Sequence, residues 1–196
     1  MKSGMFVRGV FLVTGLLMFL AAAGDASAAK FFFRSHAYSF QALRTLSSVT
    51  GGGADVSECL KAIHRIKEGD DNSWYREWFA LAEQRERTAE KFLSGGYKLS
   101  AKKEYFRASN YYRAAEFFLR SNTSDPRLLK SYRKSRDCFI KGAKLSAAPI
   151  QSMEIPFEGT TLPGYLCLVD NSGARRPLLI IQTGFDGTAE ELYFQV

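Results

Sequence analysis

The sequence predicts an α/β protein, in which an N-terminal helical domain is followed by the first strands of an incomplete sheet. From about Asp55 to Leu145, apolar residues recur at the spacing of amphipathic helices. Beyond a boundary at about 147–150, glycine and proline separate short runs with strand-like alternation. The run from Pro177 to Ile181 is apolar at consecutive positions, as in a strand that is buried on both faces. Too few strands remain to complete such a sheet.

Composition places the chain among globular proteins, because 46% of its 196 residues are hydrophobic and 24% are charged. At the start, Lys2 and Arg8 precede an apolar run, and the sequence ASA at 26–28 has the small-x-small form of a processing site. We therefore expect residues 1–28 to be a signal peptide, which exports the protein to the periplasm or out of the cell without stable membrane insertion after cleavage. The alternative is an uncleaved anchor. The run is short for that role, since a spanning helix needs about 18 to 20 apolar residues.

Residues 29–54 are a leader of uncertain structure, and residues 55–147 are expected to form the helical domain. The expected helices begin at Asp55, Ser73, Ser100 and Asp125. Aspartate is a favoured N-cap, and Pro126 follows Asp125 in the first turn, where its missing N–H costs nothing. Short connections allow four such helices to pack as an all-α unit.

Residues 148–196 are expected to begin the sheet. Alternation in "IQSMEIPFEG" and "TLPGYLCLVD" predicts two strands, and Glu158 and Gly159 supply the turn of an antiparallel hairpin. The third strand breaks on "TGFDG", Thr183 to Gly187. A turn at the carboxyl end of a strand can direct backbone N–H groups at a developing negative charge. The alternative interpretation is that its glycines only permit a tight turn.

Three segments together carry a resemblance to a known family. They are "SWYREW" (73–78), "IPFEGTTLPGYL" (155–166) and "RPLLIIQTGFDGTAEELYF" (176–194). In this order the chain resembles the α/β-hydrolase superfamily, and within it the branch of esterase-like and carbon-carbon bond hydrolases in which a helical cap domain precedes the sheet. The resemblance implies a serine-type hydrolase that cleaves an ester, amide or activated carbon-carbon bond of a small molecule, with no metal and no organic cofactor.

The resemblance also implies roles for particular residues. The turn after the third strand contributes to the oxyanion hole of the family, and here it corresponds to Gly184, Phe185 and Asp186. We expect the backbone N–H of Phe185 to be the donor, with that of Asp186 as the neighbouring alternative, and Gly184 to let the substrate approach. Trp74 and Trp78 lie at helical spacing, where packing between helices competes with contact to a hydrophobic substrate.

The chain also departs from the family. The nucleophile of the family lies in a G-x-S-x-G elbow, followed by an acid and a histidine. No G-x-S-x-G occurs in the 196 residues, and the two histidines, His36 and His64, precede the sheet. We therefore interpret the sequence as the N-terminal portion of an exported hydrolase, truncated before the nucleophile elbow and inactive by itself. The sequence indicates neither the substrate nor the oligomeric state.

A different class of protein is the alternative: a helical-repeat interaction module of tetratricopeptide type without catalysis. Small residues in "YFRASNYYRAAEFF" favour close helix packing, but no repeat is recovered and the strand-rich end is unexplained. The net charge of +7 permits binding to anionic surfaces. Nucleic-acid binding is disfavoured, because the aromatic residues among the basic ones are expected in the core, with lysine and arginine on the solvated side.

The cysteines do not indicate a zinc site or a disulfide framework. Cys59, Cys138 and Cys167 are an odd number, are far apart and show no C-x-x-C spacing. We expect them to be small buried hydrophobic residues. In an oxidising compartment, one disulfide between two of them is the alternative.

Overall fold

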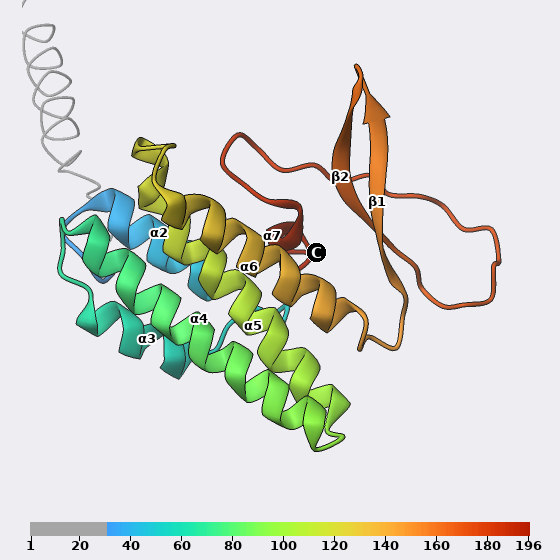
Figure 1. Cartoon of the computed structure of the whole chain (residues 1–196), viewed down its shortest axis with the longest axis horizontal. Helices are drawn as coiled ribbons and strands as arrows, with labels where there is room; N and C mark the ends of the chain where they lie inside the picture. Colours follow the sequence, from blue (N-terminus) through green and yellow to red (C-terminus); the bar gives the residue numbers. More distant parts are fainter. Residues whose placement is uncertain (1–30) are drawn as a thin grey trace, which may run out of the picture. The chain divides into compact units, whose positions relative to one another are not determined.

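The computed structural model describes residues 31–196, so the predicted signal peptide lies outside the described residues. Within residues 31–196, no helix is both long and apolar enough to cross a membrane. Helices are followed by a hairpin and a short last helix (Figure 1). The elements are α2 (His36–Ser47), α3 (Val56–Arg65), α4 (Asp71–Ser94), α5 (Lys98–Glu116), the 3-10 helix η1 (Phe117–Ser121), α6 (Pro126–Ala143), β1 (Ile150–Phe157), β2 (Thr160–Cys167) and α7 (Ala189–Leu192).

Capping residues set the helix starts largely as the sequence predicts. The carboxylate of Asp55 accepts the backbone N–H groups of Ser57 and Glu58 and so begins α3, and Asp125 caps α6 in the same way with proline in the first turn. Two helices begin two residues earlier than expected. Asp70 rather than a residue near Ser73 caps α4, and α5 begins at Lys98 rather than at Ser100.

The leader contains a helix that the sequence pattern does not reveal. Ser35 caps α2 by accepting the backbone N–H of Tyr38. The buried residues of α2 are Tyr38, Ser39, Gln41, Ala42 and Thr45. Because most of this face is small or polar, α2 lacks the apolar stripe by which amphipathic helices are recognised.

Helix α5 lies between α4 and α6 (Figure 1). Small residues on α5 let its neighbours approach closely; Ala101, Ala108, Ala114 and Ala115 are at most 1% exposed. Beside them, the carboxylate of Glu86 on α4 accepts hydrogen bonds from Tyr112 Oη at 2.7 Å and Lys134 Nζ at 2.9 Å. Burial alone would raise the pKa of Glu86, but these two hydrogen bonds and the positive charges of Lys134 and Lys141 outweigh it and lower the pKa. Glu86 therefore joins all three helices.

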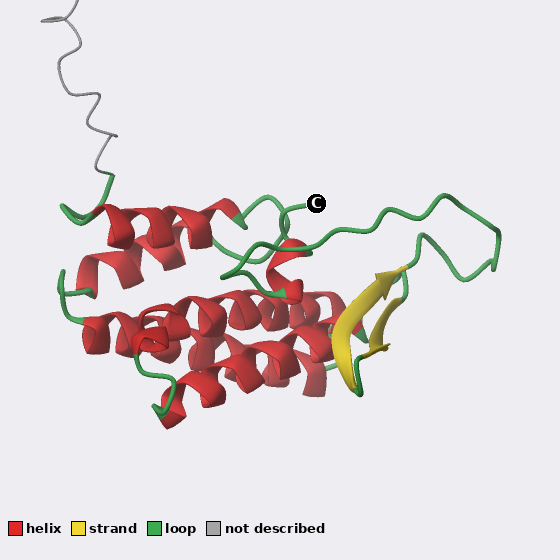
Figure 2. Cartoon of the chain, turned by 90° about the horizontal axis from the view of Figure 1, so that it is seen from above, coloured by secondary structure: helices red, strands yellow, loops and turns green. Residues whose placement is uncertain are grey.

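The predicted hairpin is confirmed. β1 and β2 pair antiparallel in a register that places Ile150 opposite Cys167 and Phe157 opposite Thr160. The turn residues Glu158 and Gly159 have φ angles of 44° and 79°, in the left-handed region that the turn requires. Figure 2 shows the two strands as a hairpin that leads into a long loop.

The prediction of a third strand is wrong for this structure. Residues 177–181 form no strand, and Leu178, Leu179 and Ile180 are 72%, 79% and 83% exposed. A strand exists only when neighbouring strands accept and donate its backbone hydrogen bonds, and the hairpin supplies no such partner among the described residues. The apolar run therefore stays an extended loop.

Candidate active site

The turn Thr183–Gly187 leaves backbone donors free at the predicted oxyanion-hole position. The N–H of Gly187 lies 3.4 Å from the carbonyl oxygen of Gly184, which closes the turn. Within the described residues, neither the N–H of Phe185 nor that of Asp186 donates a hydrogen bond. The side chain of Phe185 is fully exposed. Two adjacent N–H groups are thus available to an anion from outside the chain.

Two arginines of the helical domain bind this turn, and both bind Asp186. Arg44 on α2 donates from Nη1 to the Asp186 carboxylate at 2.8 Å and from Nη2 to its carbonyl oxygen at 3.4 Å. Arg120 on η1 donates from Nη1 to the same carbonyl oxygen at 2.7 Å. Both guanidinium groups also lie over the ring of Phe117, at 5.9 and 5.2 Å from its centroid. The helical domain therefore holds the turn through both the backbone and the side chain of one residue.

Beneath the turn lies a buried group of ion pairs. Glu191 of α7 accepts from Nε and Nη2 of Arg44, each at 2.6 Å, and lies 3.6 Å from Nη1 of Arg113. Glu116 pairs with Arg120 one helical turn away. Burial lowers the pKa of Arg113 to about 10, which still leaves it protonated at neutral pH. With the half-exposed Asp186, three carboxylates face three guanidinium groups, so the charges of the group balance.

Helix α7 is anchored on its other sides as well. Glu190 accepts a hydrogen bond from Tyr165 Oη on β2 at 2.6 Å. The ring of Phe194, 2% exposed, packs in a second small core. A methyl group added to Gly51 or Gly53 would lie 2.2 or 2.6 Å from atoms of Phe194, so the GGG of the leader leaves the space that Phe194 occupies. These contacts fix the end of α7 close to the ion pairs.

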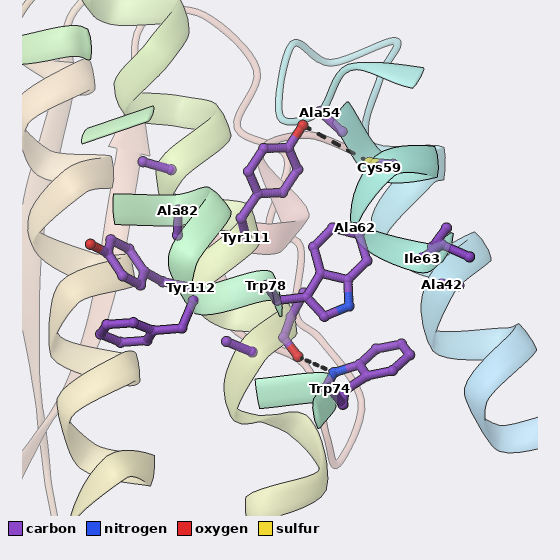
Figure 3. Close-up of a cluster of buried hydrophobic side chains, with 14 of the residues drawn as sticks. Ala42, Ala54, Cys59, Ala62, Ile63, Trp74, Trp78, Ala82, Tyr111 and Tyr112 are labelled. Carbon is purple, nitrogen blue, oxygen red and sulfur yellow. Dashed lines mark hydrogen bonds between the residues drawn. The ribbon is translucent and has the colours of Figure 1, made fainter. Parts of the chain in front are cut away.

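The two predicted substrate-contact tryptophans lie in the core of the helical domain (Figure 3). Trp74 and Trp78 are 0% exposed. Trp74 donates from Nε1 to the carbonyl oxygen of Ala114 at 2.8 Å, and Trp78 packs on Tyr111 with ring centroids 5.7 Å apart. Packing accounts for both residues in this structure. Contact between these tryptophans and a substrate stays a prediction. Neither side chain has exposed surface in this structure.

The structure corrects two expectations about polar residues. Arginines on α5 were expected on the solvated side, but the side chain of Arg113 is 2% exposed; Thr45 and Asn110 accept its hydrogen bonds, and Glu191 pairs with its charge inside the domain. Cys167 was expected to be buried, but it is exposed at the end of β2.

The other cysteines agree with the expectation. Cys59 and Cys138 are free and buried, and burial raises the pKa of Cys59 to about 12. Among the described residues, no group of three histidine, cysteine or acidic side chains could hold a metal ion. His36 and His64 are both exposed, on α2 and α3, and neither forms an ion pair or hydrogen bond in the described part of the chain.

Sequence comparison relates the chain to fungal hydrolases, although no family model matches it. It is 40% identical over 177 residues to the hydrolase acrC of Aspergillus aculeatus, and this match covers 83% of the chain and 41% of that protein. It is 41% identical over 166 residues to the 20-hydroxy-prefusarin hydrolase FUS2 of Gibberella moniliformis, covering 83% of the chain and 40% of that protein. The α/β-hydrolase xenA of Xenoacremonium sinensis is 37% identical over 167 residues, with 83% and 39% covered.

Among solved structures, a 2,6-dihydroxy-pseudo-oxynicotine hydrolase matches 61% of the chain and 32% of its own length, with 26% identity and a TM-score of 0.49. The chain thus spans about 40% of the length of the curated relatives that it matches. These relatives are hydrolases, and none of those compared is a helical-repeat module.

Proposed function

Because the chain belongs to the α/β-hydrolase family, we propose that it supplies the helical domain and the oxyanion-hole turn of a serine-type hydrolase acting on an ester, amide or activated carbon-carbon bond of a small molecule. One observation carries the proposal. The N–H groups of Phe185 and Asp186 have no acceptor within the described residues, although the rest of the turn is fixed by two arginines.

The chemistry requires such donors. When a nucleophile attacks a carbonyl group, the carbonyl oxygen becomes an oxyanion, and N–H groups about 2.7–3.1 Å from it stabilise that charge. Donors that are already oriented need no rearrangement during the reaction. In this scheme Phe185 supplies the first N–H, Asp186 can supply a second, and Gly184 adds no side chain to obstruct the substrate.

The nucleophile, acid and histidine are proposed to come from sequence outside these 196 residues. The chain contains no G-x-S-x-G, and its two histidines are exposed and unpaired in the part that the structure describes. We use the term complete hydrolase for this chain together with the further sequence needed to reach the length of its relatives, of which it spans about 40%. The chain alone is expected to be inactive.

A serine-directed fluorophosphonate probe tests whether the nucleophile lies outside these 196 residues. The complete hydrolase is expected to be labelled and to cleave a simple nitrophenyl ester, and replacement of its elbow serine by alanine should abolish both. The 196-residue chain should show neither. Labelling of the chain alone would contradict the proposal, as would a complete hydrolase that the probe does not label at any pH between about 6 and 9.

We further propose that the protein is exported, on the basis of the charged start, the apolar run and the ASA sequence at 26–28. Expression in a bacterial host, followed by fractionation and N-terminal sequencing, tests it. A periplasmic product that begins at Ala29 is expected. A cytoplasmic product that retains Met1 would contradict export.

A further inference from the structure

We propose that Arg120, together with Arg44, is a positioning residue of the oxyanion-hole turn, so that the helical domain sets the direction of the donor N–H groups. The inference rests on the proposed function. It goes beyond that function because it assigns a catalytic consequence to residues of the helical domain, which the family comparison and the sequence pattern leave without a role.

The first step of the argument is where the arginines bind. A guanidinium that binds only a side chain docks a segment without fixing its backbone. Here Arg120 donates to the carbonyl oxygen of Asp186 at 2.7 Å, and Arg44 reaches the same oxygen at 3.4 Å. This carbonyl belongs to the peptide plane between Asp186 and Gly187, which adjoins the plane that carries the N–H of Asp186. Because Arg44 also holds the Asp186 carboxylate, both the carbonyl and the side chain of Asp186 are held, and this limits how the adjoining donor plane can turn.

The second step is that the arginines themselves are held. Nε of Arg120 lies 3.0 and 3.2 Å from the two carboxylate oxygens of Glu116, and Glu116 is 3% exposed. The Arg120 guanidinium also lies over Phe117 at 5.2 Å. A planar, multiply bonded guanidinium keeps its direction better than a lysine ammonium would. Arg120 can therefore follow a moving turn only if its partly buried ion pair with Glu116 breaks.

The third step separates positioning from simple docking. Arg44 binds both the turn and Glu191, so its loss would also release α7. Arg120 donates to the C-terminal segment only at the Asp186 carbonyl. A change at Arg120 should therefore loosen the turn while Arg44, Tyr165 and the buried Phe194 keep α7 in place.

The experiment compares Arg120→Met with Arg87→Met. Both arginines pair with a glutamate four residues earlier, but Arg87 is 65% exposed and contacts no part of the turn. Because Arg120→Met leaves Glu116 buried without its partner, the double variant Glu116→Gln/Arg120→Met is made as well. Arg120→Lys, which keeps the charge on a single donor nitrogen, is the conservative variant.

The first readout is the backbone ¹⁵N order parameter of Phe185, Asp186 and Gly187 in the 196-residue chain. A rigid backbone has a value near about 0.85, and a flexible one falls below about 0.6. We expect the rigid value in the unsubstituted chain and in Arg87→Met, and the flexible value in Arg120→Met and in the double variant. The values for α7 should not change in any of them.

The second readout is steady-state kinetics in the complete hydrolase. Misplaced donors should lower kcat by about 10- to 100-fold and leave KM within about twofold, since a small displacement of catalytic groups costs up to about 10²-fold. Arg120→Lys should recover part of the rate. If Arg120 served stability alone, its replacement would lower the amount of folded enzyme. The kcat of each folded molecule would then stay the same.

The two readouts distinguish a failure of the inference from a failure of the proposed function. A turn that stays rigid in both Arg120→Met and the double variant overturns the inference, whatever the rate. A turn that becomes flexible while kcat is unchanged shows that the turn takes no part in the reaction, which overturns the oxyanion-hole assignment and the catalytic part of the inference with it.

Discussion

Replacing Glu191 by glutamine tests whether the ion pairs beneath the turn hold the C-terminal segment on the helices. The side chain of Glu191 is 2% exposed and accepts from Nε and Nη2 of Arg44, each at 2.6 Å. Arg113, also 2% exposed, lies 3.6 Å from it. Glutamine keeps the shape and one acceptor oxygen but removes the negative charge that Arg44 and Arg113 share.

The expected loss of unfolding free energy depends on which ion pairs and hydrogen bonds remain in the variant. Removing one partner of a buried ion pair costs about 3–5 kcal/mol of unfolding free energy. Arg44 keeps Asp186 at 2.8 Å, and the glutamine still accepts one hydrogen bond, so the lower end applies, about 3 kcal/mol. For a chain of this size each kcal/mol moves Tm by about 2–4 °C. The variant should therefore melt about 6–12 °C below the unsubstituted protein.

Urea unfolding followed by circular dichroism measures this loss. Glu154→Gln is the matched control, because Glu154 is exposed on β1 and forms no ion pair within the described residues. The control should change the free energy of unfolding by no more than about 0.5 kcal/mol. If Glu191→Gln were as stable as the control, the ion pairs beneath the turn would not stabilise the fold, and this reasoning would be refuted.

Three further predictions concern the helical domain and the hairpin. Tyr111→Phe removes a buried hydroxyl that accepts the N–H of Asp55 at 2.8 Å and donates to a glutamate at 2.9 Å, so it should cost about 2 kcal/mol in urea unfolding, whereas Tyr97→Phe, at a residue 66% exposed, should cost under about 0.5 kcal/mol. In thiol labelling at neutral pH, Cys167 should react at once, while the buried Cys59, with its pKa raised to about 12, should react only on unfolding. Because the folded-state pKa of Glu86 is lowered, its stabilisation is present above the ordinary value of 4.5 and is lost as the pH falls through the folded-state pKa; Glu86→Gln should therefore lower stability at pH 7 and flatten the acid side of the profile of stability against pH.

Each of these has a contrary result. Equal stability of the two tyrosine variants would mean that the hydroxyl network at the start of α3 is unimportant. Three thiols that react at one rate would mean that the helical core opens freely. An acid limb that is unchanged by the loss of Glu86 would mean that its hydrogen bonds do not stabilise the ionised form.

Local chemistry explains which parts of the fold the sequence predicts. Asp55 and Asp125 cap helices through hydrogen bonds to residues two and three positions later, so the signal lies within one turn of chain. The hairpin is predicted for the same reason, since alternation and a glycine turn are local. Helix α2 is not predicted from the sequence, because its buried face is rich in polar residues, whose partners lie elsewhere in the domain.

Long-range contacts explain what the sequence misses. The run 177–181 is apolar enough for a buried strand, but strand formation depends on partners that the described residues do not provide. Arg44 and Glu191 are 147 positions apart, so no local pattern connects them. The local signs of the site are the TGFDG turn and the two acids of the short helix after it, Glu190 and Glu191, which are rarely buried without partners.

The most direct test of the central claim removes one backbone donor without changing any side chain. In the complete hydrolase, Phe185 is replaced by the corresponding α-hydroxy acid, so that an ester oxygen takes the place of the N–H. The same exchange at Val169, which is 70% exposed and outside the turn, is the control. The account predicts that kcat falls by about 10²- to 10³-fold at position 185, with KM nearly unchanged, and stays within about twofold at position 169. An unchanged kcat after the exchange at position 185, and again after the same exchange at Asp186, would contradict the assignment of this turn to the oxyanion hole.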